Sequence, residues 1–375
     1  MFEDYLTQLA ISSKFKPFQF GTSIDKYVSE FPNLENKKIA IIGVPEGRKS
    51  GKNSGTNLAA NEVRDELYKL ISNTFIQNHL VDLGNIKTGK TFEDTQVALK
   101  TVVAQLHTQN IVSIVIGGST ELSSALYESF EVQEKNTDIT FISSSLPILD
   151  GELLDKICKH EPNFLHNLNA LGFQGHYLPP RTLDVMENLG FGHVRLGALR
   201  NKIEEAEVLI RNTNLILFDI GVIKHSDAPA NFYSNPIGID SNMACQLAWY
   251  SGVSDTSNCF GIFETNPEFD ERGLTSKLVA QILWYFIDGF AHRKHDHPKL
   301  HDEFLRYRCN LHNKQPDLLF HKSKRTNRWW MEIPHPRSQH NASKNVTIPC
   351  SYSDYQMAAT GDLPDRYLNA LQKLH

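Results

Sequence analysis

The chain has 375 residues, of which 40% are hydrophobic, so it is long enough to bury a large core. Its formal net charge of −5 at pH 7 excludes the broad cationic surface of a general nucleic-acid-binding protein. No stretch stays apolar over the roughly 18 residues that a transmembrane helix needs, and we expect no signal peptide. The five cysteines are far apart and form no CxxC pair. We therefore expect a cytoplasmic protein that binds neither membranes nor nucleic acid.

Apolar, β-branched runs alternate with amphipathic segments along most of the chain. The segments 56–70 and 275–290 repeat apolar residues at helical spacing, and Thr275 is the expected N-cap of the second. Strands that are apolar on both faces and alternate with helices predict a parallel sheet covered on both sides. Functional side chains of such a sheet lie in the loops after the carboxyl ends of its strands. The strand patterns cover 37–44, 111–118, 138–143, 214–220 and 259–265, with a weaker one at 192–198.

The character of the sequence changes after about residue 292. Histidines, prolines and charged residues dominate at first, and the segment 317–334 then has the pattern of a β-hairpin. Short helices are expected near Asp354 and over 364–374. The chain is thus divided into an N-terminal segment 1–36, an α/β domain 37–292 and a C-terminal extension 293–375 that packs on this domain.

Five segments, taken in order, resemble the motifs of the ureohydrolase family of arginase, agmatinase and, most closely, formimidoylglutamase. The resemblance covers roughly residues 37–292 and depends on the order and spacing of the motifs together. It implies a three-layer α/β/α arginase-like fold with a mostly parallel central sheet. The segments are 43–70 with its Val63-Arg64 pair, "IGGSTE" (116–121) for GGxH(S/E), "FISSSLPIL" (141–149) at the place of DAHxD, "LFDIGVIKHSDAPA" (217–230) for SxDxDxxDP, and "FETNPEFDERGLTSKL" (263–278) for ExNPxxDxxGxTaxL, which is the most specific match.

The chemistry implied by this resemblance is metal-assisted hydrolysis of an amidine or guanidine carbon, with two Mn²⁺ ions held by six ligands. Only one of the six positions keeps a ligand that a divalent ion prefers, because proline and glycine offer no donor and neutral hydroxyls bind weakly. The mapping therefore predicts a degenerate metal site and no metal cofactor. The six positions fall on Thr120, Ser143, Ser145, Pro147, Asp219 and Gly221.

Three further residues are candidates for ligand binding. Glu264 ends an apolar strand, where arginase-like enzymes place a carboxylate beside the substrate cation, and His225 and Asp227 follow the Asp219 motif. Together with Asp219 they are candidates for an acid–base cluster that binds a guanidino or amidino small molecule. The alternative is that Glu264 is satisfied internally, by an arginine such as Arg272 or by backbone amides. The glycine-rich, cationic loop 43–55 is expected to be solvated.

Two functions remain open at this point. The first is a family homologue that has lost the binuclear Mn²⁺ site and acts as a binding or scaffold protein. The second is an active formimidoylglutamase-type hydrolase of C–N bonds in linear amidines. The substitutions at the ligand positions favour the first function, whereas the family resemblance favours the second. The resemblance also implies a homo-oligomer.

Overall fold

The computed structural model describes residues 2–10, 14–147, 153–311, 317–334 and 345–374, so the end of the predicted motif 141–149 lies outside the described residues. The strands that it describes form two sheets. The first contains β1 (Leu6–Thr7), β2 (Asp25–Lys26), β3 (Ile39–Gly43), β4 (Leu80–Ile86), β5 (Val112–Ile116), β6 (Thr137–Ile142), β7 (Leu165–Phe173), β8 (His193–Arg195), β9 (Leu215–Asp219) and β10 (Cys259–Phe263). The second contains β11 (Phe304–Cys309), β12 (Leu318–Ser323), β13 (Trp329–Ile333) and β14 (Val346–Cys350).

The main sheet has the strand order β1-β4-β3-β5-β10-β9-β6-β7-β8, and β2 pairs with β4. All of these pairings are parallel except that of β1 with β4. The second sheet is antiparallel, in the order β11-β12-β13-β14. The N-terminal segment thus contributes β1 and β2 to the main sheet.

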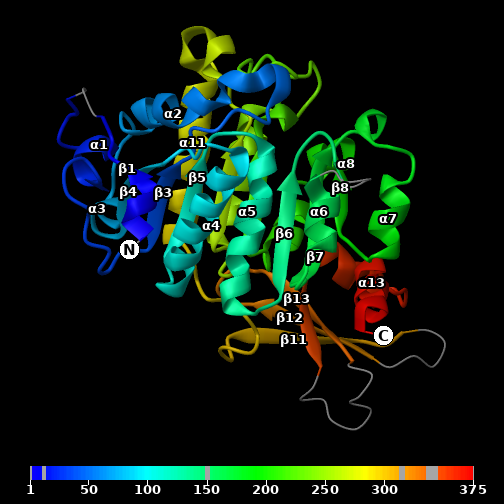
Figure 1. The fold of residues 1–375 in the computed structure, drawn as a ribbon. Coiled ribbons are helices and arrows are strands. Elements are labelled where there is room, and N and C mark those ends of the chain that lie inside the picture. Colours follow the sequence, from blue (N-terminus) through cyan, green and yellow to red (C-terminus); the bar gives the residue numbers. More distant parts are fainter. Residues whose placement is uncertain (1, 11–13, 148–152, 312–316, 335–344, 375) are drawn as a thin grey trace.

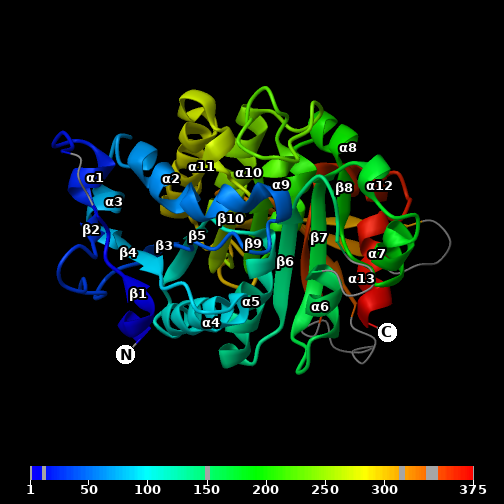
Figure 2. The ribbon, with the colours of Figure 1, turned by 45° about the horizontal axis from the view of Figure 1, so that its top comes forward.

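Helices cover both faces of the main sheet, which gives the predicted three layers (Figure 2). Helices α4, α5 and α6 lie on one face, and α2, α10 and α11 lie on the other. The α-helices are α1 (Phe20–Ser23), α2 (Ala59–Leu67), α3 (Thr74–His79), α4 (Phe92–Thr108), α5 (Ser123–Glu128), α6 (Leu153–Lys159), α7 (Thr182–Asn188), α8 (Leu196–Asn201), α9 (Glu204–Ile210), α10 (Ser241–Val253), α11 (Leu274–Ala291), α12 (Tyr352–Ala359) and α13 (Asp365–Leu374). Among the described residues, no helix is both long and apolar enough to cross a membrane.

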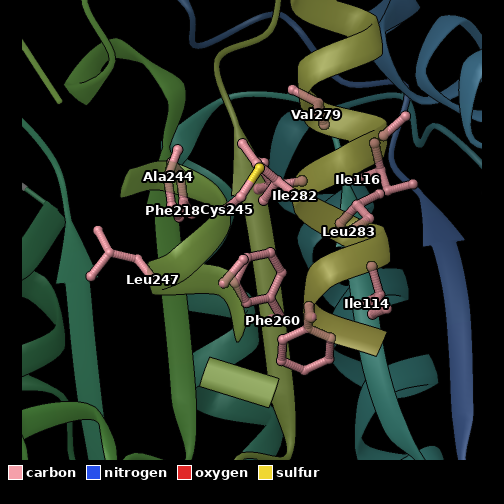
Figure 3. Packing of buried hydrophobic residues seen from close by; sticks show 14 of the residues in the cluster. Ile114, Ile116, Phe218, Ala244, Cys245, Leu247, Phe260, Val279, Ile282 and Leu283 are labelled. Atoms are coloured by element: carbon pink, nitrogen blue, oxygen red, sulfur yellow. The ribbon is translucent and has the colours of Figure 1, made fainter. Parts of the chain in front are cut away.

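Successive residues of the buried strands point to opposite faces of the sheet, so each strand contributes to two cores. In β5, Ile114 and Ile116 face α2 and α11, whereas Val115 between them faces α4 and α5. Figure 3 shows Phe260 of β10 on the first of these faces, together with Ile282 and other side chains of α10 and α11. This alternation is the reason that the strands read as continuous apolar runs.

Two strands inside the main sheet, β4 and β7, were not predicted, because buried polar residues interrupt their apolar pattern. In β4, the carboxylate of Asp82 accepts hydrogen bonds from Arg64 Nε (2.8 Å) and Tyr68 Oη (2.8 Å). In β7, the amide of Asn169 donates to Thr140 Oγ1 (3.3 Å) and to the carbonyl of Leu209 (3.0 Å). Each side chain also has a partner two residues away, Gly84 for Asp82 and Asn167 for Asn169. The other partners are distant in the sequence, so the local pattern alone does not reveal that the two side chains are buried.

The prediction that Thr275 is the N-cap of the long helix α11 is wrong. The N-cap is Gly273, and Thr275 lies in the first turn. Its backbone N–H, like that of Ser276, donates to the carboxylate of Asp270 (2.8 Å each). A carboxylate three residues before the N-cap therefore satisfies the free N–H groups of this helix end.

The C-terminal extension forms the second sheet and α12 and α13. The segment predicted as a hairpin contains β12 and β13, whereas β11 and β14 were not predicted. It lies at one end of the main sheet (Figure 1), where Arg211, just before β9, donates to the carbonyl of Trp329 (2.6 Å). The same guanidinium lies 4.8 Å from the ring centre of Trp330 and is paired with Glu207, which also binds Arg328 (2.9 Å). The extension is thus attached at the amino-terminal ends of the parallel strands, away from their carboxyl ends.

Candidate functional site

A cavity of about 660 Å³ lies at the carboxyl ends of the central strands β5, β10, β9 and β6. Its lining comes from the loops that follow each of these strands, as expected for a parallel sheet. All six positions that the family mapping singled out contribute to it, and so does Glu264. These residues are Thr120, Ser143, Ser145, Pro147, Asp219, Gly221 and Glu264.

The turn after β5 brings Thr120 to the cavity. Gly117 and Gly118 have φ angles of 97° and 78°, in the region that favours glycine. A Cβ on Gly118 would lie 2.4 Å from Leu122 Cδ1 and 2.8 Å from the carbonyl oxygen of Glu46. Two glycines at this turn are therefore required for the chain to pass so close to the loop after β3.

Glu264 is held in place by four donors and by a strained backbone. Its φ is 68°, which a residue with a side chain adopts at a cost on the order of 1–3 kcal/mol. Oε1 accepts from the backbone N–H (2.7 Å) and hydroxyl (3.1 Å) of Thr120, and Oε2 accepts from Asn53 Nδ2 (2.9 Å). Asn231 Nδ2 donates to its carbonyl oxygen (3.2 Å). Of the two alternatives from the sequence, internal hydrogen bonds are found, but the partner is not Arg272.

Asp219 lies beside Glu264 because β9 and β10 are neighbours, with Phe263 paired to Asp219 in the register. Oδ1 accepts from the backbone N–H of Gly221 (2.8 Å), and Oδ2 accepts from the hydroxyl of Ser143 (3.1 Å). Burial, and then the nearby charge of Glu264, raise the pKa of Asp219 to about 7. Burial likewise raises the pKa of Glu264.

The two carboxylates have only neutral hydrogen-bond partners in the part of the chain that the structure describes. The ion pairs found there include neither Asp219 nor Glu264. A buried carboxylate without a counter-ion is costly, and two adjacent ones repel each other. The pair consequently attracts a positive charge, and the raised pKa values mean that a proton is held up to a higher pH than by an exposed carboxylate.

His225 and Asp227 do not join this pair, so the predicted four-residue acid–base cluster is wrong. His225 Nδ1 is 2.7 Å from the hydroxyl of Ser234 and lies in a neighbouring hollow. Asp227 accepts from the backbone N–H of Ser241 at the start of α10 (2.9 Å) and pairs with Lys224 (3.3 Å). Both side chains are engaged in local turn and helix-end hydrogen bonds, which short polar side chains favour.

The sequence did not reveal the amides and aromatic side chains of the cavity. Asn53 is fully buried, although its loop 43–55 was expected to be solvated; its amide reaches both Glu264 and the backbone N–H of Phe232. Tyr177, Phe232 and Tyr233 form half-exposed aromatic walls. The role of Asn53 depends on a contact with Glu264, more than 200 residues away in the sequence, and a local sequence pattern does not predict such a contact.

No family model matches this chain. A curated formimidoylglutamase from Staphylococcus haemolyticus (strain JCSC1435) is 22% identical over 285 residues, which cover 69% of this chain and 90% of that protein. The solved structure of Trypanosoma cruzi formiminoglutamase (oxidized) with Mn2+2 at pH 6.0 matches with a TM-score of 0.65 and 21% identity, over 74% of this chain and 99% of that one. Formimidoylglutamase from Bacillus subtilis matches with a TM-score of 0.65 and 18% identity, over 77% and 97%.

These comparisons confirm the arginase-like α/β fold, and they support homology with the formimidoylglutamase/arginase superfamily. They also correct one prediction. We expected no metal cofactor, whereas the matching Trypanosoma cruzi formiminoglutamase has been solved with Mn2+2. The prediction counted the ligand positions that were replaced, and it took no account of the attraction that two adjoining carboxylates exert on any cation. We withdraw it.

The described lining nevertheless does not fit a binuclear manganese centre. In the described ranges, no three His, Cys, Asp or Glu side chains are grouped so that they hold an ion. Glu121, the third acid of the lining, lies 3.5 Å from the ammonium group of Lys156. Two manganese ions in one site need more carboxylate or imidazole ligands than Asp219 and Glu264 supply.

Proposed function

We propose that this chain is a homologue in the formimidoylglutamase/arginase superfamily that works as a binding protein for a guanidino or amidino small molecule. The observation that carries the proposal is the pair Asp219 and Glu264, which is buried in the cavity and forms no ion pair among the described residues. A planar guanidinium or amidinium group matches such a pair in charge and in geometry, because its N–H groups bind carboxylates in parallel.

The surrounding residues orient the two carboxylates for this task. Thr120 and Asn53 fix both oxygens of Glu264, and Gly221 and Ser143 fix those of Asp219. Glu264 Oε1 already accepts two hydrogen bonds, whereas Glu264 Oε2 and the two oxygens of Asp219 accept one each. Because a carboxylate accepts about four hydrogen bonds, these three oxygens keep a lone pair for a ligand. A bound cation lowers both pKa values, so binding near neutral pH is expected to release the proton that the pair holds in its absence.

Calorimetry with arginine, agmatine and formimidoylglutamate tests the proposal. At pH 7.5 we expect at least one of them to bind, and Glu264→Gln to weaken its binding at least tenfold, as the loss of a charge-assisted contact predicts. Asp227→Asn is the matched control, because Asp227 is an acid of the same region that lies outside the cavity. If none of the compounds binds, or if Glu264→Gln binds as well as wild type, the proposal is wrong.

The second candidate is an active hydrolase of C–N bonds in linear amidines. The observation that favours it is the gathering of all six mapped positions and Glu264 around one cavity, in a fold shared with formimidoylglutamases. A turnover assay decides between the two functions: release of formamide or urea in the presence of Mn²⁺ that is lost in Asp219→Asn establishes the hydrolase. Binding without turnover in the same assay supports the binding protein.

A further inference from the structure

A second hollow, of about 880 Å³, adjoins the cavity on the other side of Phe232. It lies between the loop after β9 and the short 3-10 turns η7 (Pro267–Phe269) and η8 (Glu271–Gly273) that follow β10. The two hollows share Asn231, Phe232 and Ser234 in their linings. They therefore meet along one stretch of chain, and the proposed function uses only the first of them.

The second hollow has an apolar surface. Phe232, Phe269 and Leu274 line it, and each exposes 40% or more of its surface. The rings of Phe232 and Phe269 lie 5.9 Å apart, so they form one continuous apolar patch. Exposed apolar groups that cluster around a hollow are characteristic of a binding site.

The same hollow has an excess of positive charge. The guanidinium of Arg272 forms no ion pair within the described residues, and the ammonium of Lys277 donates to the neutral carbonyl of Arg272 (2.8 Å). Glu271 is the single acid of this lining. Arg272 has a φ of 61°, so the loop after β10 holds two residues with side chains in the left-handed region, Glu264 beside the first hollow and Arg272 beside the second.

We propose that the two hollows form one elongated site for an arginyl peptide with an apolar residue and a free carboxylate. This inference rests on the proposed function, since the arginine side chain occupies the Asp219–Glu264 pair. The apolar residue packs on Phe232 and Phe269, and the terminal carboxylate binds Arg272 and Lys277. Along the site, an anionic part is thus followed by an apolar part and a cationic part. These complement the cationic side chain, the apolar residue and the carboxylate of such a peptide.

Calorimetry with the intact chain at pH 7.5 tests this ligand class, with arginine, the dipeptide arginyl-phenylalanine and its C-terminal amide as probes. We expect the dipeptide to bind about tenfold more tightly than arginine or better, and the amide to lose part of that gain. Phe269→Ala and Arg272→Gln should each remove part of the gain of the dipeptide over arginine and leave arginine binding unchanged. Both side chains are on the surface, so the variants should fold, and Phe18→Ala, at an exposed site elsewhere, is the control.

The outcomes separate the two proposals. If arginine and the dipeptide bind equally, or if Phe269→Ala and Arg272→Gln bind the dipeptide as wild type does, the elongated site is refuted and the cation-binding pair stands. If no probe binds, or if Glu264→Gln leaves all binding unchanged, the proposed function fails and the elongated site fails with it.

Discussion

Replacing Asp219 by asparagine tests whether the cavity holds two carboxylates without a counter-cation. The pKa of the aspartate is 3.8 in its ordinary state and about 7 in the folded chain, where burial and the charge of Glu264 raise it. The folded state therefore binds this proton more tightly than the unfolded state does. As the pH rises from about 4 to about 7, this group alone lowers the free energy of unfolding, by up to about 4 kcal/mol.

Asparagine carries no charge and so avoids this cost. Its oxygen can accept from the N–H of Gly221 and its amide can donate to the hydroxyl of Ser143, so both present contacts have a replacement. We expect Asp219→Asn to be more stable than wild type at pH 8, by at most about 4 kcal/mol or about 5 °C in Tm for a chain of this size. The difference should shrink as the pH falls toward 4.

Thermal and urea unfolding between pH 4 and pH 8 measure this effect, in chelator-treated buffer, because a bound cation would cancel it. Asp227→Asn is a control with the opposite sign. Burial acts to raise the pKa of Asp227, but hydrogen bonds from Ser241 and Ser226 and the charge of Lys224 hold it below its usual value. Asp227 therefore stabilises the folded chain at pH 8 and loses this effect on acidification. An Asp219→Asn variant that is less stable than wild type at pH 8 would refute the reasoning.

Three further substitutions test the architecture by urea unfolding. Gly118→Ala should cost about 1–3 kcal/mol, because its φ is 78° and the new Cβ would lie 2.4 Å from Leu122, whereas Gly197→Ala, with nothing within 4 Å, should cost nothing. Arg211→Met should cost about 3 kcal/mol and expose the second sheet to protease, because the partly buried Glu207 then keeps Arg328 as its one ion-pair partner among the described residues. Arg308→Met, on the surface, should change stability by less than about 0.5 kcal/mol. Phe260→Ala should cost about 3–5 kcal/mol, since its ring is fully buried between β10 and α11.

The meeting of Asp219 and Glu264 was within reach of the sequence, but their exact surroundings were not. Both residues end apolar strand patterns, and the carboxyl ends of parallel strands share one edge of the sheet. That β9 and β10 are direct neighbours, with Phe263 opposite Asp219, is a matter of strand order, which periodicity does not specify. Asn53 is 211 residues away from Glu264 in the sequence but hydrogen-bonds to it in the fold. It belongs to a loop whose local composition resembles that of a solvated loop.

His225 and Asp227 show the converse limit. Their closeness to Asp219 in the sequence suggested closeness in space. The chain contributes Gly221, in the 3-10 turn η6 (Ile220–Val222), to the cavity lining and returns to the lining only at Asn231, so His225 and Asp227 lie outside it. Asp227 then meets the start of α10, where the free N–H of Ser241 is a strong hydrogen-bond donor. An aspartate such as Asp227 can either line the cavity or accept a hydrogen bond from a helix start, and the sequence alone does not distinguish the two roles.

The second sheet has a consequence for how copies of this chain meet. β11 is one of the two edge strands in the order β11-β12-β13-β14, and an edge strand can pair with a strand of another molecule. Arg306 and Arg308 of β11 are both exposed, and they point to the same face of the strand. If β11 paired antiparallel with its own copy, arginine would lie near arginine, and like charges across a strand pair repel. This edge therefore resists polymerisation by strand addition, and the homo-oligomer that the sequence leads us to expect must be built on a different surface.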